Sequence, residues 1–568
     1  MILAVMLSML VFLGWNVVSE RYFPQPKPVP AASTTGTKPA TALPAAPAKL
    51  VLADAKTVAA TSPRLAIETP RLTGSINLRG ARIDDLVLPV YRETIDKKSP
   101  PVRLLSPAGA KRSYFAGFGW SGDGLSAPND ETIWTADVAK LTPTTPVTLR
   151  WDNGAGQTFA IKIAVDKAYM FTIDQSVTNS SAAPVAARAY GYINRLKPEQ
   201  TVSSFLAPSR EVDSWTIHIG PLGAFNGAMN YDVDYDDLDT VGEAGSRFAT
   251  AGGWLGFGDS YWLTALVPAQ KSTIDAGFRK GAGSYQAEYA LAPSLVGPGK
   301  TLSNTSHFFA GAKEVATLDT YEAQLGITHF GKAIDWGWFE IIEKPIFYLL
   351  DWLFKFTGNF GVAIMMLTLI VRGVMFPIAQ KQFASMAGMR VVQPKLKELQ
   401  ERYKDDKPKL QQEMMELYKR EKINPVAGCL PIFLQIPIFF ALYKVLMLTI
   451  EMRHQPFTLW ITDLSAPDPA NLVSLAALGG IPLPGILGIG ILAAVLGITM
   501  YLQFKLNPAP ADPAQQQIFA IMPWMMMFMM APFAAGLLLY WTTSNILTIA
   551  QQKWLYSRHP GMKEPVKT

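Results

Sequence analysis

Residues 360–379 read FGVAIMMLTLIVRGVMFPIA, a run of 20 residues in which Arg372 is the single charged side chain. At about 1.5 Å per residue, a helix of this length reaches about 30 Å, which is the thickness of a bilayer's hydrocarbon core. The next charge, Lys381, follows nine residues after Arg372. The stretch therefore predicts a membrane-spanning helix that carries a positive charge near the middle of the bilayer.

An unpaired guanidinium at that depth costs from about 3 to more than 10 kcal/mol. The other long apolar stretches hold no acidic residue that could neutralise Arg372. We therefore expect a water-filled cavity among the helices, in which the arginine presents its charge. A side chain that snorkels to the cytoplasmic interface is the alternative.

Four further apolar stretches lie at residues 2–18, 426–450, 486–504 and 518–556. The last is about twice the length of one span and contains Pro532 and Gly536, so it predicts two helices joined by a tight turn. The total is six spans. For residues 2–18, a cleaved signal peptide is the competing interpretation.

The loop at 380–424 holds 11 basic and 7 acidic residues, a net charge of +4, which places it in the cytoplasm by the positive-inside rule. Alternation of the spans then places the C-terminus in the cytoplasm and the long N-terminal region outside, in a periplasm. Apolar residues at three- and four-residue steps predict a helical hairpin in this loop. It is either a solvated connector or a mobile lid that docks incoming chains.

Residues 61–325 differ from the rest because short alternating or β-branched runs are broken there by Gly, Pro, Asn and Asp. Examples are residues 147–151, 159–165 and 262–267. Many such strands with turn signals between them are typical of a β-sandwich. The predicted fold class is an α-helical polytopic membrane protein with six spans and a large periplasmic all-β sandwich.

These patterns divide the chain into six parts. They are a first transmembrane anchor (1–20), a linker rich in Pro and Ala (21–60), the β-sandwich domain (61–325), an interfacial amphipathic helix (326–358), a helical core (359–556) with its cytoplasmic hairpin (380–424), and a basic cytoplasmic tail (557–568). The interfacial helix is inferred from aromatic residues mixed with charges. The alternative is a buried helix of the β domain.

The composition argues against several functions. One cysteine, Cys429, permits no disulfide within the chain, and five scattered histidines form no metal motif, so we expect no metal and no cofactor. The net charge of +6 comes from basic residues beside membrane segments, which favours lipid and not nucleic acid as their partner. No signature of a catalytic site is present, so we expect no enzyme.

Several longer motifs resemble those of the YidC family of bacterial membrane protein insertases. They are residues 370–373 with Pro377, 393–395, 412–418, 422–425, 428–431, 435–439, 460–465, 512–516, 522–523, 536–540 and 544–545. The resemblance covers residues 335–556. Residues 64–325 are similar to the family's periplasmic β-sandwich, especially at 252–255.

The resemblance implies a five-helix insertase core with a groove open to the cytoplasm and the lipid, and it implies roles for nine side chains. Arg372 would supply the charge of the groove, whose wall would be Thr368, Gln435, Tyr540 and Trp541; a hydrophobic slide would consist of Pro437, Phe439, Pro523 and Met529. The implied partners are nascent membrane-protein substrates, the Sec translocon with its accessory proteins, the ribosome and the lipid bilayer, without direct nucleic-acid specificity.

Two other classes compete with this hypothesis. An anion transporter would use Arg372 as its substrate site, although no internal repeat relates the helices. An envelope binding protein would capture a ligand with its β domain and use the helices as an anchor.

Overall fold

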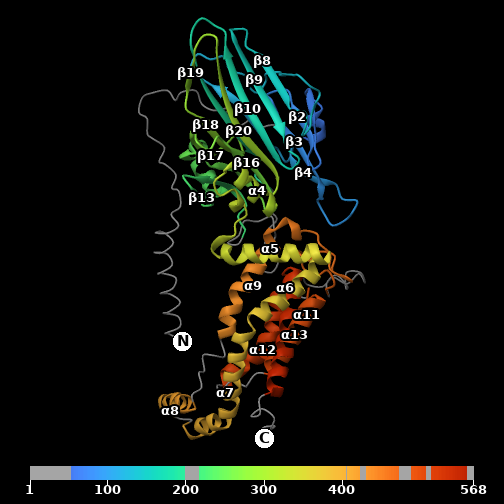
Figure 1. Ribbon diagram of the computed structural model, residues 1–568, viewed down its shortest axis with the longest axis vertical. Helices are drawn as coiled ribbons and strands as arrows, with labels where there is room; N and C mark the ends of the chain where they lie inside the picture. The colour runs from blue at the N-terminus through green and yellow to red at the C-terminus, as the bar shows by residue number, and fades with distance from the viewer. Residues whose placement is uncertain are drawn as a thin grey trace. The chain divides into compact units, whose positions relative to one another are not determined.

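The computed structural model describes residues 53–198, 217–403, 406–421, 430–471, 488–506 and 513–558. The predicted first span, most of the predicted linker and the basic tail beyond 558 lie outside these residues. The described chain forms two compact units, which meet in the sequence between Asp335 and Trp336 (Figure 1).

The first unit contains two mainly antiparallel sheets. The first sheet comprises β1 (Arg64–Glu68), β2 (Thr73–Asn77), β3 (Arg82–Arg92), β4 (Pro101–Leu105), β5 (Tyr114–Ser121), β7 (Lys140–Leu141), β11 (Val185–Arg195), β14 (Ser246–Ala251), β17 (Thr273–Gly281), β18 (Ser284–Leu291) and β19 (Ser294–Val296). Its strands are hydrogen-bonded in the order β14-β17-β18-β11-β5-β3-β2-β1-β7, and in addition β19 pairs with β11 and β4 pairs with β3. The second sheet comprises β6 (Thr135–Ala136), β8 (Val147–Asp152), β9 (Gln157–Val165), β10 (Met170–Asn179), β12 (Gly220–Phe225), β13 (Ala228–Asn230), β15 (Trp254–Gly258), β16 (Trp262–Val267) and β20 (Lys300–Ala312). Its strands are hydrogen-bonded in the order β13-β12-β15-β16-β20-β10-β9-β8-β6. Among the described residues of this unit, three α-helices accompany the sheets: α2 (Ala55–Ala59), α3 (Tyr235–Val241) and α4 (Val315–Leu325).

Side chains from the two sheets meet in one core. Phe118 on β5 packs edge-on against Phe308 on β20, with ring centroids 6.2 Å apart. The Tyr114 hydroxyl on β5 lies 2.5 Å from the Thr264 hydroxyl on β16. Because buried aromatic side chains contribute much of the hydrophobic stabilisation of a core, these contacts hold the sheets face to face. This unit is therefore a β-sandwich, and the prediction of a β-rich domain is confirmed.

A network of hydrogen bonds around Glu314 fixes the start of α4 to the sheets. Its carboxylate accepts hydrogen bonds from Arg71 at 2.6 Å, Tyr91 at 2.8 Å, Tyr169 at 2.9 Å and Thr317 at 2.8 Å. Burial alone would raise the pKa of Glu314, but the hydrogen bond from Arg71 and those from the other donors outweigh it, and the pKa is lowered.

We expect Glu314→Gln to destabilise the β-sandwich at neutral pH by about 2 kcal/mol, because hydrogen bonds to a charged group are lost. A carboxyl whose pKa is depressed by folding stabilises the fold above its unfolded pKa, about 4.3, and loses that contribution as the pH falls through the folded value. The melting temperatures of wild type and variant, measured against pH, should therefore differ at neutral pH and converge in acid. A difference that stays constant down to acid pH would contradict this assignment.

The second unit is helical. Its long helices are α5 (Glu340–Thr357), α6 (Phe360–Val374), α7 (Phe376–Arg402), α8 (Lys407–Arg420), α9 (Leu430–Leu448), α11 (Ile491–Leu506), α12 (Pro513–Met530) and α13 (Ala535–Arg558). Helix α13 packs against α6, α9 and α11, as Figure 1 shows for α6 and α11. Within the described part of the chain, no helix combines the length and the apolar character needed to cross a membrane.

Helix α5 has apolar side chains on both a buried and an exposed face. Phe347, Leu350 and Leu353 are buried, whereas the side chains of Trp352 and Phe356 are 60% and 73% exposed and stack on each other. Aromatic side chains on an exposed helix face suit a lipid interface. The predicted interfacial segment, 326–358, contains this helix.

The prediction of one continuous helix over 360–379 is wrong at its C-terminal end. Helix α6 ends at Val374, and α7 begins at Phe376 with Pro377 in its first turn. Proline has no N–H to donate and its ring clashes with the carbonyl four residues earlier, so the chain breaks just before it. The break leaves Arg372 in the last turn of α6.

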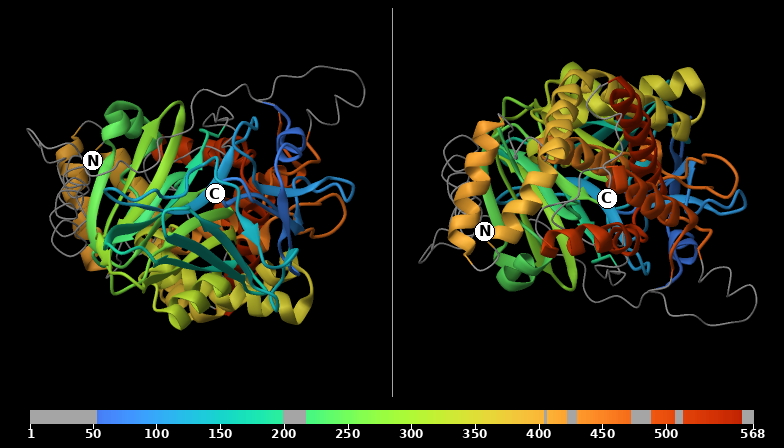
Figure 2. Two further views of the ribbon diagram at one scale, coloured as in Figure 1. Left: turned by 90° about the horizontal axis from the view of Figure 1, so that it is seen from above. Right: turned by 90° about the horizontal axis from the view of Figure 1, so that it is seen from below.

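The region predicted as a cytoplasmic hairpin contains two helices, α7 and α8, which lie side by side in the view from below (Figure 2). Val392, Leu396 and Leu417 form their shared apolar core. The Lys395 ammonium lies 2.7 Å from the Glu421 carboxylate, and this hydrogen bond lowers the pKa of Glu421.

The long apolar stretch at 518–556 is divided between two helices. Helix α12 ends at Met530 and α13 starts at Ala535, so Pro532 lies in the turn between them as predicted. Gly536, the other residue predicted for the break, lies instead in the first turn of α13.

Candidate functional site

The side chain of Arg372 reaches from α6 to α13. Its Nε donates a hydrogen bond to the Ser544 hydroxyl at 3.0 Å, and its Nη2 donates to the same oxygen. Ser544 is buried and Arg372 is partly buried. Among the residues that the structure describes, no carboxylate forms an ion pair with Arg372. The arrangement therefore holds a positive charge between helices without neutralising it.

A second hydrogen bond connects α13 to α9. The Gln435 amide donates to the Tyr540 hydroxyl at 2.6 Å. Tyr540 lies four residues before Ser544, so both side chains lie on the same face of α13. One helix face thus brings together the polar groups of Arg372, Ser544, Tyr540 and Gln435, which come from three helices.

Two other residues predicted for the groove wall have different surroundings. The Thr368 hydroxyl is buried and donates to the Ile364 carbonyl at 2.7 Å, within its own helix. Because its proton is used there, Thr368 contributes mainly packing. Trp541 follows Tyr540 and packs edge-on against Phe439 of α9, with ring centroids 4.9 Å apart.

The residues predicted for the hydrophobic slide lie on α9 and α12. Phe439 contacts α13 through Trp541, and Pro437 lies two residues earlier, inside α9. On α12, Pro523 is buried and Met529 is 36% exposed. The four residues are therefore placed on two separate helices.

Ser544 is the residue of this site to which the sequence prediction gave no role, although residues 544–545 were among the motifs that resemble the family. Its hydroxyl is the observed partner of Arg372, 172 residues away along the chain. The available signal was its spacing of four residues from Tyr540, which was already a candidate. A similar bond lies further along α13, where the Asn545 amide donates to the Thr499 hydroxyl on α11 at 3.2 Å.

Large apolar side chains are exposed on the helices around the site. They include Leu369 and Val374 on α6, Ile498 and Leu502 on α11, and Ile518, Ile521, Trp524, Met525 and Phe528 on α12. Patches of this kind on a helical bundle are typical of a surface covered by lipid or by another apolar partner. Within the described ranges, no cluster of His, Cys, Asp and Glu could hold a metal ion.

Two family models together match most of the chain. Residues 64–349 match the YidC periplasmic domain, and residues 352–563 match the 60Kd inner membrane protein. The membrane protein insertase YidC of Zymomonas mobilis is 46% identical to this chain over 577 residues, which cover 99% of this chain and 96% of that protein. The protein of the same name from Granulibacter bethesdensis is 43% identical and covers 99% of this chain and 98% of its own length. A crystal structure of an active YidC insertase, with its first transmembrane domain resolved, is similar at 17% identity and a TM-score of 0.37, covering 97% of this chain and 99% of its own.

The sequence matches, the β-sandwich and the helical unit together define an inner-membrane protein with a β-rich periplasmic domain. The chain belongs to the YidC family of membrane protein insertases. This membership favours the insertase hypothesis over the anion transporter and the envelope binding protein.

Proposed function

We propose that the chain inserts and folds inner-membrane proteins, alone or with the Sec translocon, through a positively charged groove open to the cytoplasm and the lipid. One observation carries the proposal: the Arg372 guanidinium is held by Ser544 and has no carboxylate partner among the described residues. A charge kept in this state is available to an acidic group of a substrate. Acidic N-terminal tails of short membrane proteins have that chemistry.

The groove wall would consist of Thr368, Gln435, Tyr540 and Trp541 around Arg372. The hydrogen bond between Gln435 and Tyr540 supports this role, because it keeps two polar side chains oriented beside the charge. Polar groups of a substrate tail that enters the groove would exchange hydrogen bonds with water for hydrogen bonds with Gln435 and Tyr540, whereas Thr368 would contribute packing.

The hydrophobic slide would consist of Pro437, Phe439, Pro523 and Met529. The apolar segment of a substrate would move along α9 and α12 into the lipid while its tail rests near Arg372. Exposed apolar side chains on α12 support a passage beside this helix. Burial of about 20 apolar residues in the bilayer would drive the process without ATP, and the groove would lower the barrier for the polar tail.

We further propose six membrane spans, a periplasmic β-sandwich, and a cytoplasmic C-terminus. The net charge of +4 on the loop at 380–424 supports a cytoplasmic position for α7 and α8. These two helices and the basic tail would contact the ribosome, and the core would contact the Sec translocon and its accessory proteins. The protein would act by binding and positioning and would need no catalytic residue.

The test is insertion of a single-span substrate by the full-length protein in liposomes. A substrate with an acidic N-terminal tail is compared with one in which the same acids are replaced by their amides. We expect protein-dependent insertion of both, with faster insertion of the acidic tail at low salt, because the attraction to Arg372 is electrostatic. No insertion of either substrate, in vesicles that remain sealed, would refute the proposed function.

Removal of residues 64–315, which form most of the β-sandwich, should leave a substantial part of the insertion activity. The reason is that all nine residues proposed for the groove and the slide lie in the helical unit. The measurement is the same liposome assay, with the melting transition of the remaining helical unit as the control for folding. Complete loss of insertion by a folded deletion variant would favour the envelope binding protein instead.

A further inference from the structure

The loop that connects β3 to β4 in the β-sandwich ends in an ordered turn. The Ser99 N–H donates to the Asp96 carbonyl at 2.9 Å, which closes a four-residue turn whose two central residues are Lys97 and Lys98. The Lys98 N–H donates to Asp96 Oδ1 at 2.8 Å, and the Thr94 N–H donates to the Ser99 hydroxyl at 3.1 Å. These bonds hold the two lysines at the tip of the hairpin.

The tip of this hairpin exposes apolar and basic side chains together. Ile95 is 52% exposed, and Val90, near the end of β3, is 60% exposed. Lys97 and Lys98 are exposed too, and neither ammonium group forms an ion pair within the described part of the chain. An apolar side chain beside two basic ones matches the boundary of an anionic bilayer, where the apolar group enters the lipid and the basic groups contact the headgroups.

Contacts at the base of the hairpin show from which end of the β-sandwich it projects. The Tyr91 hydroxyl on β3 donates to the Glu314 carboxylate at 2.8 Å, at the start of α4. The neighbouring Lys313 ammonium donates to the Ala333 carbonyl at 3.4 Å. Because the chain leaves this unit at Asp335, the hairpin projects from the end after which the helical unit follows in the sequence (Figure 1).

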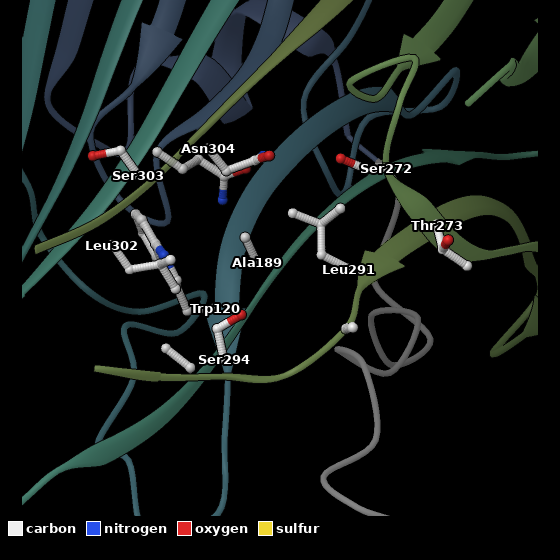
Figure 3. Close-up of a pocket in the computed structure, with 12 residues that line it drawn as sticks. Trp120, Ala189, Ser272, Thr273, Leu291, Ser294, Leu302, Ser303 and Asn304 are labelled. Atoms are coloured by element: carbon white, nitrogen blue, oxygen red, sulfur yellow. The ribbon is translucent and has the colours of Figure 1, made fainter. Parts of the chain in front are cut away.

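A pocket of about 290 Å³ lies toward the opposite end of the β-sandwich (Figure 3). Its lining includes Leu302, near the start of β20, whereas Ala312 ends this strand next to Lys313. Ten residues of a strand extend over about 33 Å, so the pocket is far from the hairpin. Leu295, which is 77% exposed, follows the lining residue Ser294 and is a matched control for Ile95.

We propose that the tip of the hairpin between β3 and β4 binds the anionic surface of the lipid bilayer. The Ile95 side chain would enter the boundary between headgroups and acyl chains, and Lys97 and Lys98 would contact lipid phosphates. The contact would restrict the motion of the β-sandwich above the membrane. The proposal rests on the inner-membrane position of the family and not on the insertion mechanism.

A lipid surface fits this tip better than a protein partner does. A stable protein interface buries about 800 Å² on each side and requires a complementary shape. A projecting turn of four residues offers much less area than that. A bilayer surface adapts to the side chains that enter it, and each lysine near an anionic surface contributes without a fixed geometry.

The test is electron paramagnetic resonance on the full-length protein in nanodiscs. Cys429, the one native cysteine, is replaced by serine, and a nitroxide is attached to Ile95→Cys or to the control Leu295→Cys. The bilayer is zwitterionic phosphatidylcholine, alone or mixed with anionic phosphatidylglycerol. Lipid contact is measured from collisions of the nitroxide with oxygen, which concentrates in lipid, relative to collisions with a water-soluble nickel complex. Because both sites carry the same label, the affinity of the label itself for lipid is controlled.

We expect lipid contact of the label at residue 95 in the anionic bilayer, and exposure to water of the label at residue 295 in both bilayers. Lys97→Ala combined with Lys98→Ala should lower the ratio of lipid-bound to free tip roughly thirtyfold, at about 1 kcal/mol for each lysine. Lys271→Ala combined with Lys300→Ala removes two exposed lysines near the pocket and should leave the ratio unchanged.

Three results would overturn the proposal. They are a label at residue 95 that stays in water in every bilayer, a contact that persists unchanged without anionic lipid or without Lys97 and Lys98, and equal lipid contact of the label at residue 295. Melting temperatures of the variants confirm that the β-sandwich is folded in each measurement.

Discussion

Replacement of Arg372 by alanine should slow the insertion of a substrate with an acidic tail by roughly a hundredfold. The acidic group would then enter a low-dielectric region without an opposite charge, which costs about 3 kcal/mol. The measurement is the initial rate of protease protection of the substrate in liposomes, for wild type and variant at equal protein density. Because the hydrogen bonds of the guanidinium in the described chain go to a single serine of another helix, its removal should leave the fold intact.

Two controls make this result specific. Arg372→Lys keeps the charge and should recover a large part of the rate. Val374→Ala removes a side chain of the same helix that is 76% exposed, and it should have little effect. Full activity of Arg372→Ala with an acidic substrate would mean that the charge is dispensable and that insertion of this substrate depends on the hydrophobic slide.

Replacement of Asp259 by alanine should destabilise the β-sandwich by about 3–5 kcal/mol. The Arg195 guanidinium is buried, donates to both Asp259 oxygens at 2.7 and 3.0 Å, and lies over the Tyr114 ring at 4.5 Å. Burial also lowers the pKa of Lys313 to about 8, and the Asp259 carboxylate opposes that shift. Removing this carboxylate therefore leaves the buried Arg195 cation without its ion-pair partner and takes away one of the two carboxylates, Asp259 and Asp335, that favour the charged form of Lys313.

The measurement is thermal unfolding of the β-sandwich, whose midpoint should fall by roughly 10 °C. The double variant Asp259→Ala with Arg195→Met should recover much of the loss, because the buried charge is removed together with its partner. If the double variant is less stable than Asp259→Ala alone, Arg195 contributes mainly by its own packing, and the explanation by an uncompensated charge is wrong.

The β-rich character of the first unit could be predicted from the sequence, whereas the order of its strands could not. Alternating runs such as residues 159–165 identify single strands, but β10 pairs with β20, about 130 residues later, and not with the β11 strand that follows it. Pairing over that distance depends on which faces bury each other in the finished core. Local periodicity carries no information about it.

For the helical unit, the sequence identified candidate residues of the site but did not predict the contacts between them. Arg372 was identifiable because a charge inside an apolar run is costly. Ser544 was not, because a serine in a helix is ordinary and its position relative to α6 depends on how α13 packs. The roles proposed for the groove and the slide remain predictions. The break at Met375 shows that the continuous apolar pattern did not predict where α6 ends, because Pro377 interrupts the helix.

If Arg372 binds the acidic tail of a substrate as proposed, its contact with Ser544 would also limit which of its N–H groups the substrate can use. A guanidinium has five N–H bonds in one plane, and two of them point to the serine oxygen. The other three, on Nη1 and Nη2, are left for a second partner, and two parallel N–H bonds match the two oxygens of a carboxylate. An acidic tail could therefore bind and dissociate while Ser544 holds the Arg372 side chain in place. The geometry of the binding site would then stay the same from one substrate to the next.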